Sequence, residues 1–565
     1  MKKHLLLFIS AVLLPLFAQG QKQHIHSIDE LNRNWDTDTH LKENRYRLEP
    51  DFRTMVDLGE AELGFQKLHY PRIKVLKDGS YILFYQSSRI GYHCYCAFSK
   101  DGLHWERGPR VFEGHPIVNS GGEKDSRGYS TVDAVVLDNG DILAFVSYRA
   151  VKGYTRFPQD DGLSMKRSTD GGRTWSEEKE IYKSITWEPY AMQLPSGEVQ
   201  VYFTDSDHDW EPASSGVTML RSLDRGETWT THCQVIRQYR ATGRRKDGQP
   251  GTRKVWTDQM PSAVLLGDGK TILAAVESQD SLNHFHITFV KDDTNWATTL
   301  TGEMEGPASR LDNWRSGGGP YLSHFPSGET ALSFQGKYFH VSLGLSTFTS
   351  LKQARFIQPF GYRRGLWGST QILDPHTLFA VAPSLDHKMD KSVISLCKMR
   401  LNHRVDAPYS HVRVGGNTIE WADNTDALFL GSESQAQCSF RFAHDELMLY
   451  MLVECLDSEL LYRDKIVFKF SNGTDDKDIF SSFVEVTQKG VAVDRDLEGK
   501  VYEEPGVGYL AEIAIPLSVL PRAPDRLFFY AEIRKSGLVD GFSALKETEY
   551  FHWMPVKMMG WAQNQ

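Results

Sequence analysis

A chain of 565 residues with 40% apolar and 12% aromatic content is long and hydrophobic enough to form two or more globular domains. Its formal net charge of -9 gives no reason to expect nucleic-acid binding, because that function requires clustered Lys and Arg. Six cysteines in a chain of this length exclude a disulfide-rich scaffold.

The first 20 residues have the pattern of a secretory signal peptide. Lys2 and Lys3 precede the apolar run LLLFISAVLLPLFA, and the small residues Ala18 and Gly20 lie at its end. The run is too short for a convincing membrane span, and no cysteine follows it that would indicate a lipoprotein anchor. We therefore expect cleavage near Gly20 and a secreted or periplasmic protein.

Six copies of one phrase follow between residues 71 and 384. Each has an apolar segment, a turn with Gly or Pro beside Asp, Asn or Ser, and a second apolar segment, which is the pattern of a β-hairpin. The copies begin at 71, 131, 187, 258, 318 and 367 and read PRIKVLKDGSYILFYQSS, TVDAVVLDNGDILAFVSYR, WEPYAMQLPSGEVQVYFTD, DQMPSAVLLGDGKTILAAVES, GGPYLSHFPSGETALSFQ and WGSTQILDPHTLFAVAPS. Such a period predicts a solenoid or a propeller.

A polar turn that ends in tryptophan follows several of these hairpins. It reads SKDGLHW at 99–105, RSTDGGRTW at 167–175 and RSLDRGETW at 221–229. A degenerate copy, called the worn copy below, reads VKDDTNW at 290–296. The Asp carboxylate can accept backbone N–H bonds within the turn, and the indole offers a large apolar face. We expect each tryptophan to pin the turn against its own sheet. A sugar-stacking role is the alternative.

Six hairpins extended to four strands each predict an all-β fold, a six-bladed β-propeller over residues 60–400. Residues 21–59 are then a lead-in segment and 401–411 a linker. In the region 412–565, the alternating segments CSFRFAHDELMLYMLVECLDS and GYLAEIAIPLSVL predict a β-sandwich.

The tryptophan turns resemble the Asp boxes of the sialidase superfamily. The phrases WEPYAMQLPSGEVQVYFTD, MPSAVLLGDGKTILAAVES and GGPYLSHFPSGETALSFQ are similar to glycoside hydrolase family 93, the exo-arabinanases. The resemblance covers about 330 residues and implies a secreted exo-acting glycosidase. In the last region, AEIAIPLSVL and IEWADNTDALFLG resemble family 9 carbohydrate-binding modules. Trp421, Trp553 and Trp561 are candidate stacking platforms there, but core packing or a domain interface is the favoured interpretation for each, so none is assigned to a site.

Blade geometry brings two carboxylates together. In a propeller, the start of the first strand and the end of the second strand of every blade lie at the same mouth of the channel. Glu188 precedes the turn glycine Gly197 by nine residues, and Glu277 follows Gly269 by eight. We therefore expect both carboxylates at one mouth, from adjacent blades, which is the constellation that glycoside hydrolysis requires.

The two glutamates differ in their surroundings. Glu277 lies in the apolar segment ILAAVES, so partial burial would raise its pKa and suit it to the acid role. The family resemblance implies that Glu188 is the nucleophile and Glu277 the acid/base of a retaining mechanism. The alternative is that both form structural ion pairs. The mechanism requires no metal and no organic cofactor.

The same rule places other residues at this mouth as candidate substrate-binding groups. They are Arg72, Asp133, Arg149, Trp187, Asp205 and Asp258. Trp187 would form a wall of a sugar subsite. Arg72 and Arg149 could together hold a substrate carboxylate by bidentate hydrogen bonds, which would favour a sialic or uronic acid. Arg72, in the phrase R-I-K, partly resembles the first arginine of the sialidases.

Three other functions stay open. A sialidase would need two more arginines, for which Arg315, Arg363 and Arg364 are available, and a tyrosine nucleophile. A polysaccharide lyase would use Tyr and His, and His69, Tyr70 and His93 lie near the first hairpin. A glycan-binding protein would lack a working carboxylate pair. In every case the partner is an oligo- or polysaccharide. The sequence leaves the sugar, the linkage and the oligomeric state open.

Overall fold

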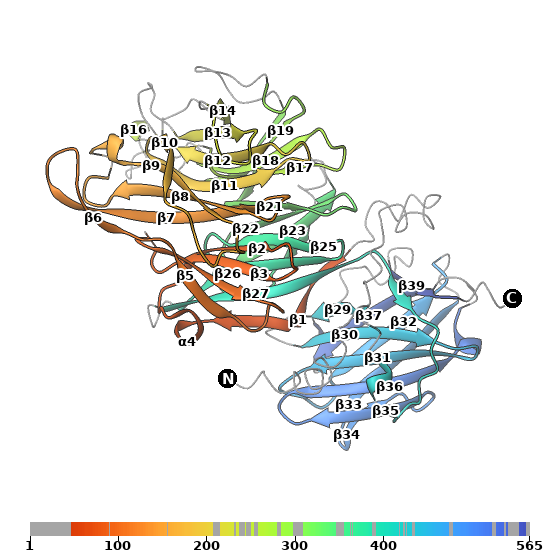
Figure 1. The fold of residues 1–565 in the computed structure, drawn as a ribbon. Helices are drawn as coiled ribbons and strands as arrows, with labels where there is room; N and C mark the ends of the chain where they lie inside the picture. The colour runs from red at the N-terminus through yellow and green to blue at the C-terminus, as the bar shows by residue number, and fades with distance from the viewer. Residues whose placement is uncertain are drawn as a thin grey trace. The chain divides into compact units, whose positions relative to one another are not determined.

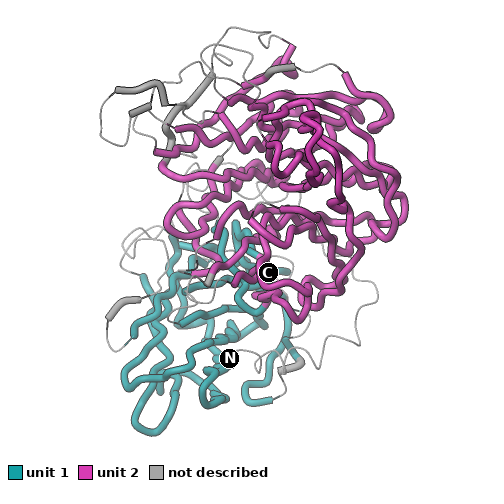
Figure 2. Tube along the Cα trace, turned by 90° about the vertical axis from the view of Figure 1, so that its left-hand side faces the viewer, with its two compact units in different colours: residues 1–53, 399–565 teal, residues 54–398 magenta. Residues whose placement is uncertain are grey.

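The computed structural model divides the chain into two compact units, one of residues 54–398 and one of residues 1–53 with 399–565 (Figure 2). It describes residues 47–560 apart from 90, 155, 207–214, 231–232, 237–242, 245–249, 254–257, 280–283, 298–308, 346–354, 362, 364, 387–390, 417, 422–423, 425, 432–435, 474–477, 522–526, 536–537 and 541–552. The predicted signal peptide, Arg364 and Trp561 therefore lie outside the described residues.

Six antiparallel sheets form the first unit, and they correspond to the six predicted hairpin copies (Figure 1). Blade one contains β2 (His69–Val75), β3 (Tyr81–Gln86), β4 (Cys94–Ser99) and β5 (Glu106–Phe112). Blade two contains β7 (Lys124–Val136), β8 (Ile142–Ala150), β9 (Gly162–Ser168) and β10 (Lys179–Lys183), with β6 (His115–Val118) added beside β7. Blade three contains β11 (Thr186–Gln193), β12 (Val199–Asp205), β13 (Gly216–Ser222) and β14 (Cys233–Ile236).

The remaining three blades follow the same plan. Blade four contains β17 (Gln259–Leu265), β18 (Ile272–Gln279), β19 (Phe285–Asp292) and β20 (Ser309–Ser316). Blade five contains β21 (Gly318–His324), β22 (Glu329–Gln335), β23 (Phe339–Leu345) and β24 (Arg355–Ile357). Blade six contains β25 (Ser369–Asp374), β26 (Thr377–Asp386), β27 (Lys391–Asn402) and β1 (Arg47–Leu58). Short elements join these strands: α4 (Glu60–Leu63), η2 (Pro158–Asp160) and the hairpin of β15 (Gly243–Arg244) and β16 (Pro250–Arg253).

The first strands of successive blades close a ring. β2 packs on β7, β7 on β11, β11 on β17, β17 on β21, β21 on β25 and β25 back on β2. The fold is thus a six-bladed β-propeller. Strand β1, which lies in the segment expected to be a lead-in, supplies the outer strand of blade six. Lys398 N donates to Thr54 Oγ1 at 2.9 Å and Ser395 Oγ to Asp57 Oδ1 at 2.6 Å, so residues from the two ends of the propeller segment close the ring.

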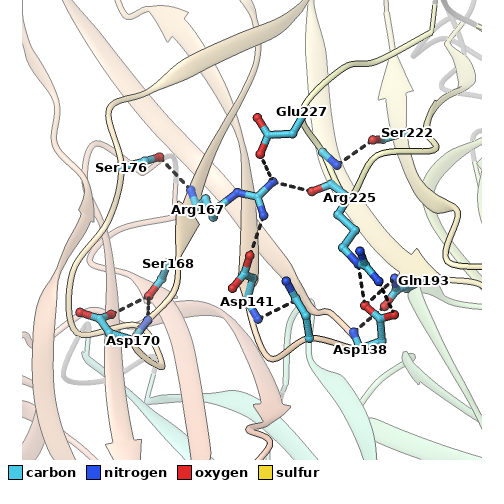
Figure 3. Close-up of polar contacts among 12 residues, drawn as sticks. Asp138, Asp141, Arg167, Ser168, Asp170, Ser176, Gln193, Ser222, Arg225 and Glu227 are labelled. Atoms are coloured by element: carbon cyan, nitrogen blue, oxygen red, sulfur yellow. Dashed lines mark hydrogen bonds and ion pairs between the residues drawn. The ribbon is translucent and has the colours of Figure 1, made fainter.

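The Asp-box carboxylates accept the predicted bonds inside their turns. Asp170 accepts from Thr174 N at 2.9 Å and from Thr174 Oγ1 at 2.6 Å. It also accepts from Ser168 Oγ at 2.8 Å (Figure 3). Asp224 receives the same bonds from Thr228 and Ser222. These bonds lower the pKa of both carboxyls to about 2, so each stays ionised at neutral pH.

The prediction that each tryptophan packs on its own sheet is wrong. Trp175 of blade two contacts Phe84 of blade one edge-on, with ring centroids 5.9 Å apart. Trp229 of blade three contacts Phe145 of blade two in the same way at 5.6 Å. The turn projects beyond the end of its third strand, where the nearest apolar surface is the second strand of the preceding blade. The tryptophans therefore hold neighbouring blades together.

Arginines at the start of the Asp boxes add a polar link between blades. Arg167 of blade two binds Asp141 of its own blade and reaches Glu227 and the carbonyl of Arg225 in blade three (Figure 3). Arg225 in turn donates to the Asp138 carboxylate of blade two through Nε and Nη2, each at 3.0 Å. Such exposed pairs contribute little individually, but as a network they order the turns.

Each first strand also bends sharply near one mouth of the ring. Register shifts interrupt the pairing of β2, β7, β11, β17 and β21 with the second strand. A residue in the left-handed region lies at each of these shifts, and a sixth precedes β25. These six are Tyr70, Thr131, Glu188, Met260, Gly319 and Trp367, with φ between 48° and 61°. Five of the six are not glycine, a conformation that costs about 1 kcal/mol or more per residue.

Two sheets form the other unit, as the alternating segments predict. One contains β28 (Val405–Ala407), β39 (Met554–Met558), β37 (Leu527–Lys535), β32 (Lys465–Ser471), β33 (Ile479–Thr487) and β34 (Gly490–Val493), with β38 (Leu538–Asp540) beside β37. The second contains β29 (Leu428–Gly431), β30 (Gln437–His444), β31 (Met448–Leu456), β36 (Gly508–Pro516) and β35 (Glu498–Glu504). The short helices η3 (Thr418–Trp421) and η4 (Leu517–Val519) lie in its loops. Trp421 and Trp553 are fully buried, which favours the core reading for both.

Replacing tryptophan by phenylalanine distinguishes the fully buried copy of the turn tryptophan from the half-buried ones. Trp296, in the worn copy, is 1% exposed, and its Nε1 donates to Tyr202 OH of blade three at 2.9 Å. Trp296→Phe should lower the free energy of unfolding by about 2 kcal/mol, since it loses this bond and core volume. Trp229→Phe, at a half-buried position, should cost less than about 1 kcal/mol. Equal costs in denaturant titrations would contradict the larger contribution assigned to the buried Trp296 and its bond to Tyr202.

Candidate active site

Glu188 and Glu277 lie near the bends of adjacent blades. Glu188 is itself the left-handed residue of β11, and Glu277, near the end of β18, pairs in register with Gln259. Glu277 is 8% exposed and Glu188 is half-buried. The negative charge of Glu188 raises the pKa of Glu277, so the two carboxyls lie within electrostatic reach of one another.

The Glu277 carboxyl has two hydrogen-bond donors. Gly319 N donates to Oε2 at 2.7 Å and Gln259 Nε2 to Oε1 at 3.1 Å. Burial nevertheless raises the pKa of Glu277 to about 8, with the Glu188 charge as the second cause. A Cβ at Gly318 would lie 2.4 Å from Glu277 Oε2, so glycine is required there for the carboxyl to keep this position. Because its pKa is raised to about 8, Glu277 is protonated at neutral pH.

The Glu188 carboxyl is balanced differently. Burial raises its pKa to about 7, and several groups oppose the rise: the Thr204 hydroxyl, the charges of Arg149 and Arg72, and the Met260 N–H. Thr204 Oγ1 donates to Glu188 Oε2 at 2.7 Å. Both pKa values are thus raised, and the donors and charges around Glu188 favour its ionised form relative to that of Glu277. General acid catalysis requires one ionised carboxylate beside one carboxylic acid.

One aromatic–cation group surrounds Glu188 on the side of blades one and six. Tyr70 stacks on Trp367 with centroids 4.6 Å apart. The Arg72 guanidinium lies over the Tyr70 ring and donates to the Trp367 carbonyl at 2.8 Å. Glu188 and Glu277 both raise the pKa of Tyr70, which places its hydroxyl within electrostatic reach of both carboxyls.

A second such group comes from blades two and three. The Arg149 guanidinium lies 3.4 Å from the centroid of the Trp187 ring and binds Ser130 Oγ. Trp187 Nε1 donates to Tyr154 OH at 2.6 Å, and the two rings meet edge-on. Arg149 thus covers one face of the indole, so a sugar could stack only on the opposite face of Trp187.

The three aspartates have other surroundings. Asp133 forms an ion pair with Lys74 at 2.9 Å and accepts from Tyr321 OH at 3.1 Å. Asp205 accepts from Ser184 Oγ at 2.7 Å and also from Tyr182 and Thr218. Asp258 is fully buried, and its N–H donates to Ser278 Oγ at 3.4 Å. Arg72, Arg149 and Trp187 thus gather around the glutamates, whereas Asp133 and Asp205 bind side chains elsewhere in the blades.

The channel widens beyond the Lys74–Tyr321 contact. A cavity of about 560 Å³ is lined by the far halves of the first strands of all six blades. Lys74, Tyr190 and Tyr321 form part of its wall. The Arg72 guanidinium lies over the Tyr321 ring, 5.1 Å from its centroid. The glutamates are not among the residues that line this cavity.

Residues proposed for the other functions have different partners. Arg363 forms an ion pair with Asp57 at 2.7 Å. The side chain of Arg315 lies outside the described part of the structure. Burial lowers the pKa of His69 to about 4, and His93 Nδ1 accepts the Gly114 N–H at 3.0 Å. A neutral His69 remains chemically able to act as a base. Among the described residues, no group of three His, Cys, Asp or Glu could hold a metal ion.

Several residues at this site were missed in the sequence. Thr204 ends its second strand as Glu277 does, so the spacing rule would have found it if applied to hydroxyls as well as to charges. Trp367 is the first residue of the sixth hairpin phrase, as Trp187 is of the third, so the same rule would have found it, whereas Tyr154 lies outside the hairpins and carries no comparable signal.

Comparisons with known proteins leave the family open. No family model and no curated protein matches the chain. Among solved structures, a protein of unknown function from Dyadobacter fermentans is 15% identical with a TM-score of 0.46, over 63% of this chain and 100% of that one. The GH93 α-L-arabinofuranosidase of Fusarium graminearum, in complex with arabinobiose, is 14% identical with a TM-score of 0.44, over 63% and 97%. Trypanosoma rangeli sialidase, in complex with the inhibitor DANA, is 11% identical with a TM-score of 0.39, over 85% and 87%.

None of the helices in the described part of the chain is long and apolar enough to cross a bilayer.

The raised pKa of Glu277 predicts a pH-dependent gain in stability for Glu277→Gln. In the unfolded chain this carboxyl ionises near pH 4.5, whereas in the folded protein it stays protonated to about pH 8. Folding therefore binds a proton in this window, and wild-type stability falls as the pH rises. The glutamine keeps an acceptor for Gly319 N–H. The free energy of unfolding of Glu277→Gln relative to wild type should thus rise between pH 5 and 8, by on the order of 2 kcal/mol.

Thermal and denaturant unfolding at several pH values measure this difference. Glu177→Gln, at an exposed position after the second Asp box, is the control and should show no such trend. A Glu277→Gln effect that is constant across this range would contradict the raised pKa.

Proposed function

We propose that this protein is a secreted glycoside hydrolase that releases sugars from the ends of an oligo- or polysaccharide. One observation carries the proposal: two carboxyl groups lie at the bends of adjacent blades. Glu188 binds Thr204, which accepts from Met260 N. Glu277 binds Gln259, the residue before Met260. Burial raises the pKa of both carboxyls, which suits Glu277 to the acid role. The resemblance of the hairpin phrases to family 93 supports the same assignment and adds the exo-acting mode. The N-terminal signal-peptide pattern supports secretion.

Glu277 is the proposed general acid. Its proton passes to the glycosidic oxygen as the bond between that oxygen and the anomeric carbon breaks. Ionised Glu188 attacks the anomeric carbon, and Glu277, now a carboxylate, then takes a proton from the water that releases the sugar. This retaining course follows the family resemblance. In an inverting course, Glu188 would instead activate water directly.

The charge balance favours an acidic sugar as the second candidate substrate. Arg72 and Arg149 both act on Glu188, and near neutral pH the protonated Glu277 carries no charge to offset them. A uronate or sialate carboxylate would restore neutrality beside these guanidinium groups. The sandwich unit, for its part, is proposed either to bind glycan or to stabilise the enzyme.

Conservative variants on a glycan panel test the reaction. Glu188→Gln and Glu277→Gln should each lower kcat/KM by about 100-fold or more, since each removes a proton-transfer or nucleophilic group. Glu177→Gln should leave it unchanged. The panel includes aryl arabinosides, uronides and sialosides with matched oligosaccharides, and product analysis reports the sugar, linkage and exo action. Turnover that survives both variants, or an unsaturated uronate product, would exclude this mechanism.

The activity should also have a narrow pH optimum. Glu188 must be ionised and Glu277 protonated, so the profile of kcat/KM should be bell-shaped, with apparent limbs near pH 7 and 8 that belong to the coupled pair. A profile that is flat between pH 5 and 9 would contradict the assignment of these two groups.

A further inference from the structure

A repeated contact joins neighbouring blades at three of the bends. There the N–H of the left-handed residue donates to a side chain on the second strand of the preceding blade: Thr131 N to Gln86 at 2.7 Å, Met260 N to Thr204 at 2.8 Å and Gly319 N to Glu277 at 2.7 Å. The bulge removes this N–H from the ladder with the second strand, so each bend needs an acceptor from elsewhere.

The three acceptors occupy one structural position. Gln86 pairs with His69, Thr204 with Trp187 and Glu277 with Gln259, in each case just before the register shift. A neutral amide or hydroxyl therefore satisfies this position in blades one and three. The acceptor position itself does not require a charge.

Thr204 differs from Gln86 in what else it binds. Its Oγ1 accepts from Met260 N and donates to Glu188 Oε2 at 2.7 Å. A hydroxyl has a single proton, and the Met260 N–H fills one acceptor direction, so the proton is directed at the carboxylate. The Glu188 N–H donates to Thr131 Oγ1 at 3.1 Å, so threonines hold Glu188 at both its backbone and its side chain.

We propose that Thr204 is a positioning residue that couples the bend of blade four to Glu188 and stabilises the ionised form of its carboxyl relative to the protonated form. The proposal deepens the proposed function, since it concerns the group assigned as nucleophile or base. Hydrogen bonds to a charged acceptor are roughly twice as strong as neutral ones, so this contact favours the carboxylate over the acid.

Other groups also face Glu188 and remain in every variant. They are Arg149 on β8, Arg72 and Tyr70 on β2, and Glu277 on β18. The Met260 N–H faces both Thr204 and Glu188, so it can turn wholly to the carboxylate when the hydroxyl is removed. Removing Thr204 therefore raises the pKa of Glu188 only by the share of the stabilisation that the Met260 N–H cannot supply in its place.

The test measures stability against pH and needs no substrate. In Thr204→Val, the ionised form of Glu188 loses a donor, so its pKa rises further, and the cost of the variant should grow as Glu188 ionises. We expect its effect on the unfolding equilibrium constant to be about tenfold larger at pH 9 than at pH 5, corresponding to one pKa unit. Thr204→Ser keeps the hydroxyl and should show no such growth. If Thr204→Val does not fold, Thr204→Ala is measured in its place.

Two controls separate this effect from a general structural cost. In a Glu188→Gln background, Thr204→Val should cost the same at pH 5 and pH 9. Gln86→Leu removes the equivalent acceptor in blade one, which binds no carboxylate, and its cost should also be independent of pH. A Thr204→Val cost that is equal at both pH values, or that grows equally without Glu188, would overturn the proposal.

Kinetics then distinguish this proposal from the proposed function. If the protein hydrolyses glycosides, Thr204→Val should move the acid limb of the pH profile upward and Thr204→Ser should restore it. A stability effect as predicted, together with Glu188→Gln turnover equal to wild type, would keep the positioning contact and reject the catalytic role of Glu188.

Discussion

Shielding the carboxyls of buried Glu277 and half-buried Glu188 from water is the constraint on which the chemistry of this molecule depends. An isolated buried carboxylate is costly, and the protein meets that cost by keeping protons on the carboxyls rather than by pairing them with bases. Arg72 and Arg149 are close enough to moderate Glu188, but each guanidinium is also held by other groups, a carbonyl in one case and Ser130 with Trp187 in the other. The result is a site in which Glu277 retains its proton at neutral pH.

The ring of blades makes that burial possible. Each first strand turns at a left-handed residue that lies within it or just before it. The released N–H donates to a side chain of the preceding blade at four of these bends, those of Thr131, Glu188, Met260 and Gly319. Tyr70, Glu188 and Trp367 are three of these turning residues, so the bends also set where the aromatic and acidic side chains of the site begin. Farther out, the Asp-box tryptophans pack on the preceding blade and link neighbouring sheets again. Strain at the bends is thus balanced by contacts between blades, and the site inherits its geometry from those contacts.

Much of this architecture could be predicted from periodicity. The six hairpins, the third strands and the Asp-box bonds follow from turn residues and alternating apolar segments, and the same counting rule placed Glu188 and Glu277 in adjacent blades. The left-handed bends were beyond such reasoning, because Thr131 is β-branched and only Gly319 has the residue type that predicts positive φ. Partner choice was equally hidden: the tryptophans pack on the preceding blade, Asp205 of blade three accepts from Tyr182 of blade two, and Arg149 of blade two covers the Trp187 ring of blade three. Each depends on side-chain reach between blades, which spacing along one blade does not contain.

Direct titration of the glutamate carboxyls tests the central claim most clearly. Carbon-detected NMR of protein labelled at glutamate Cδ follows each protonation state, and Glu188→Gln and Glu277→Gln assign the two signals by their disappearance. The account predicts two carboxyls that are still protonated at pH 6 and ionise near pH 7 and 8, the higher value falling when Glu188 is replaced. If both signals instead titrate near 4.5, like solvated glutamates, the two side chains are not buried together and the account fails.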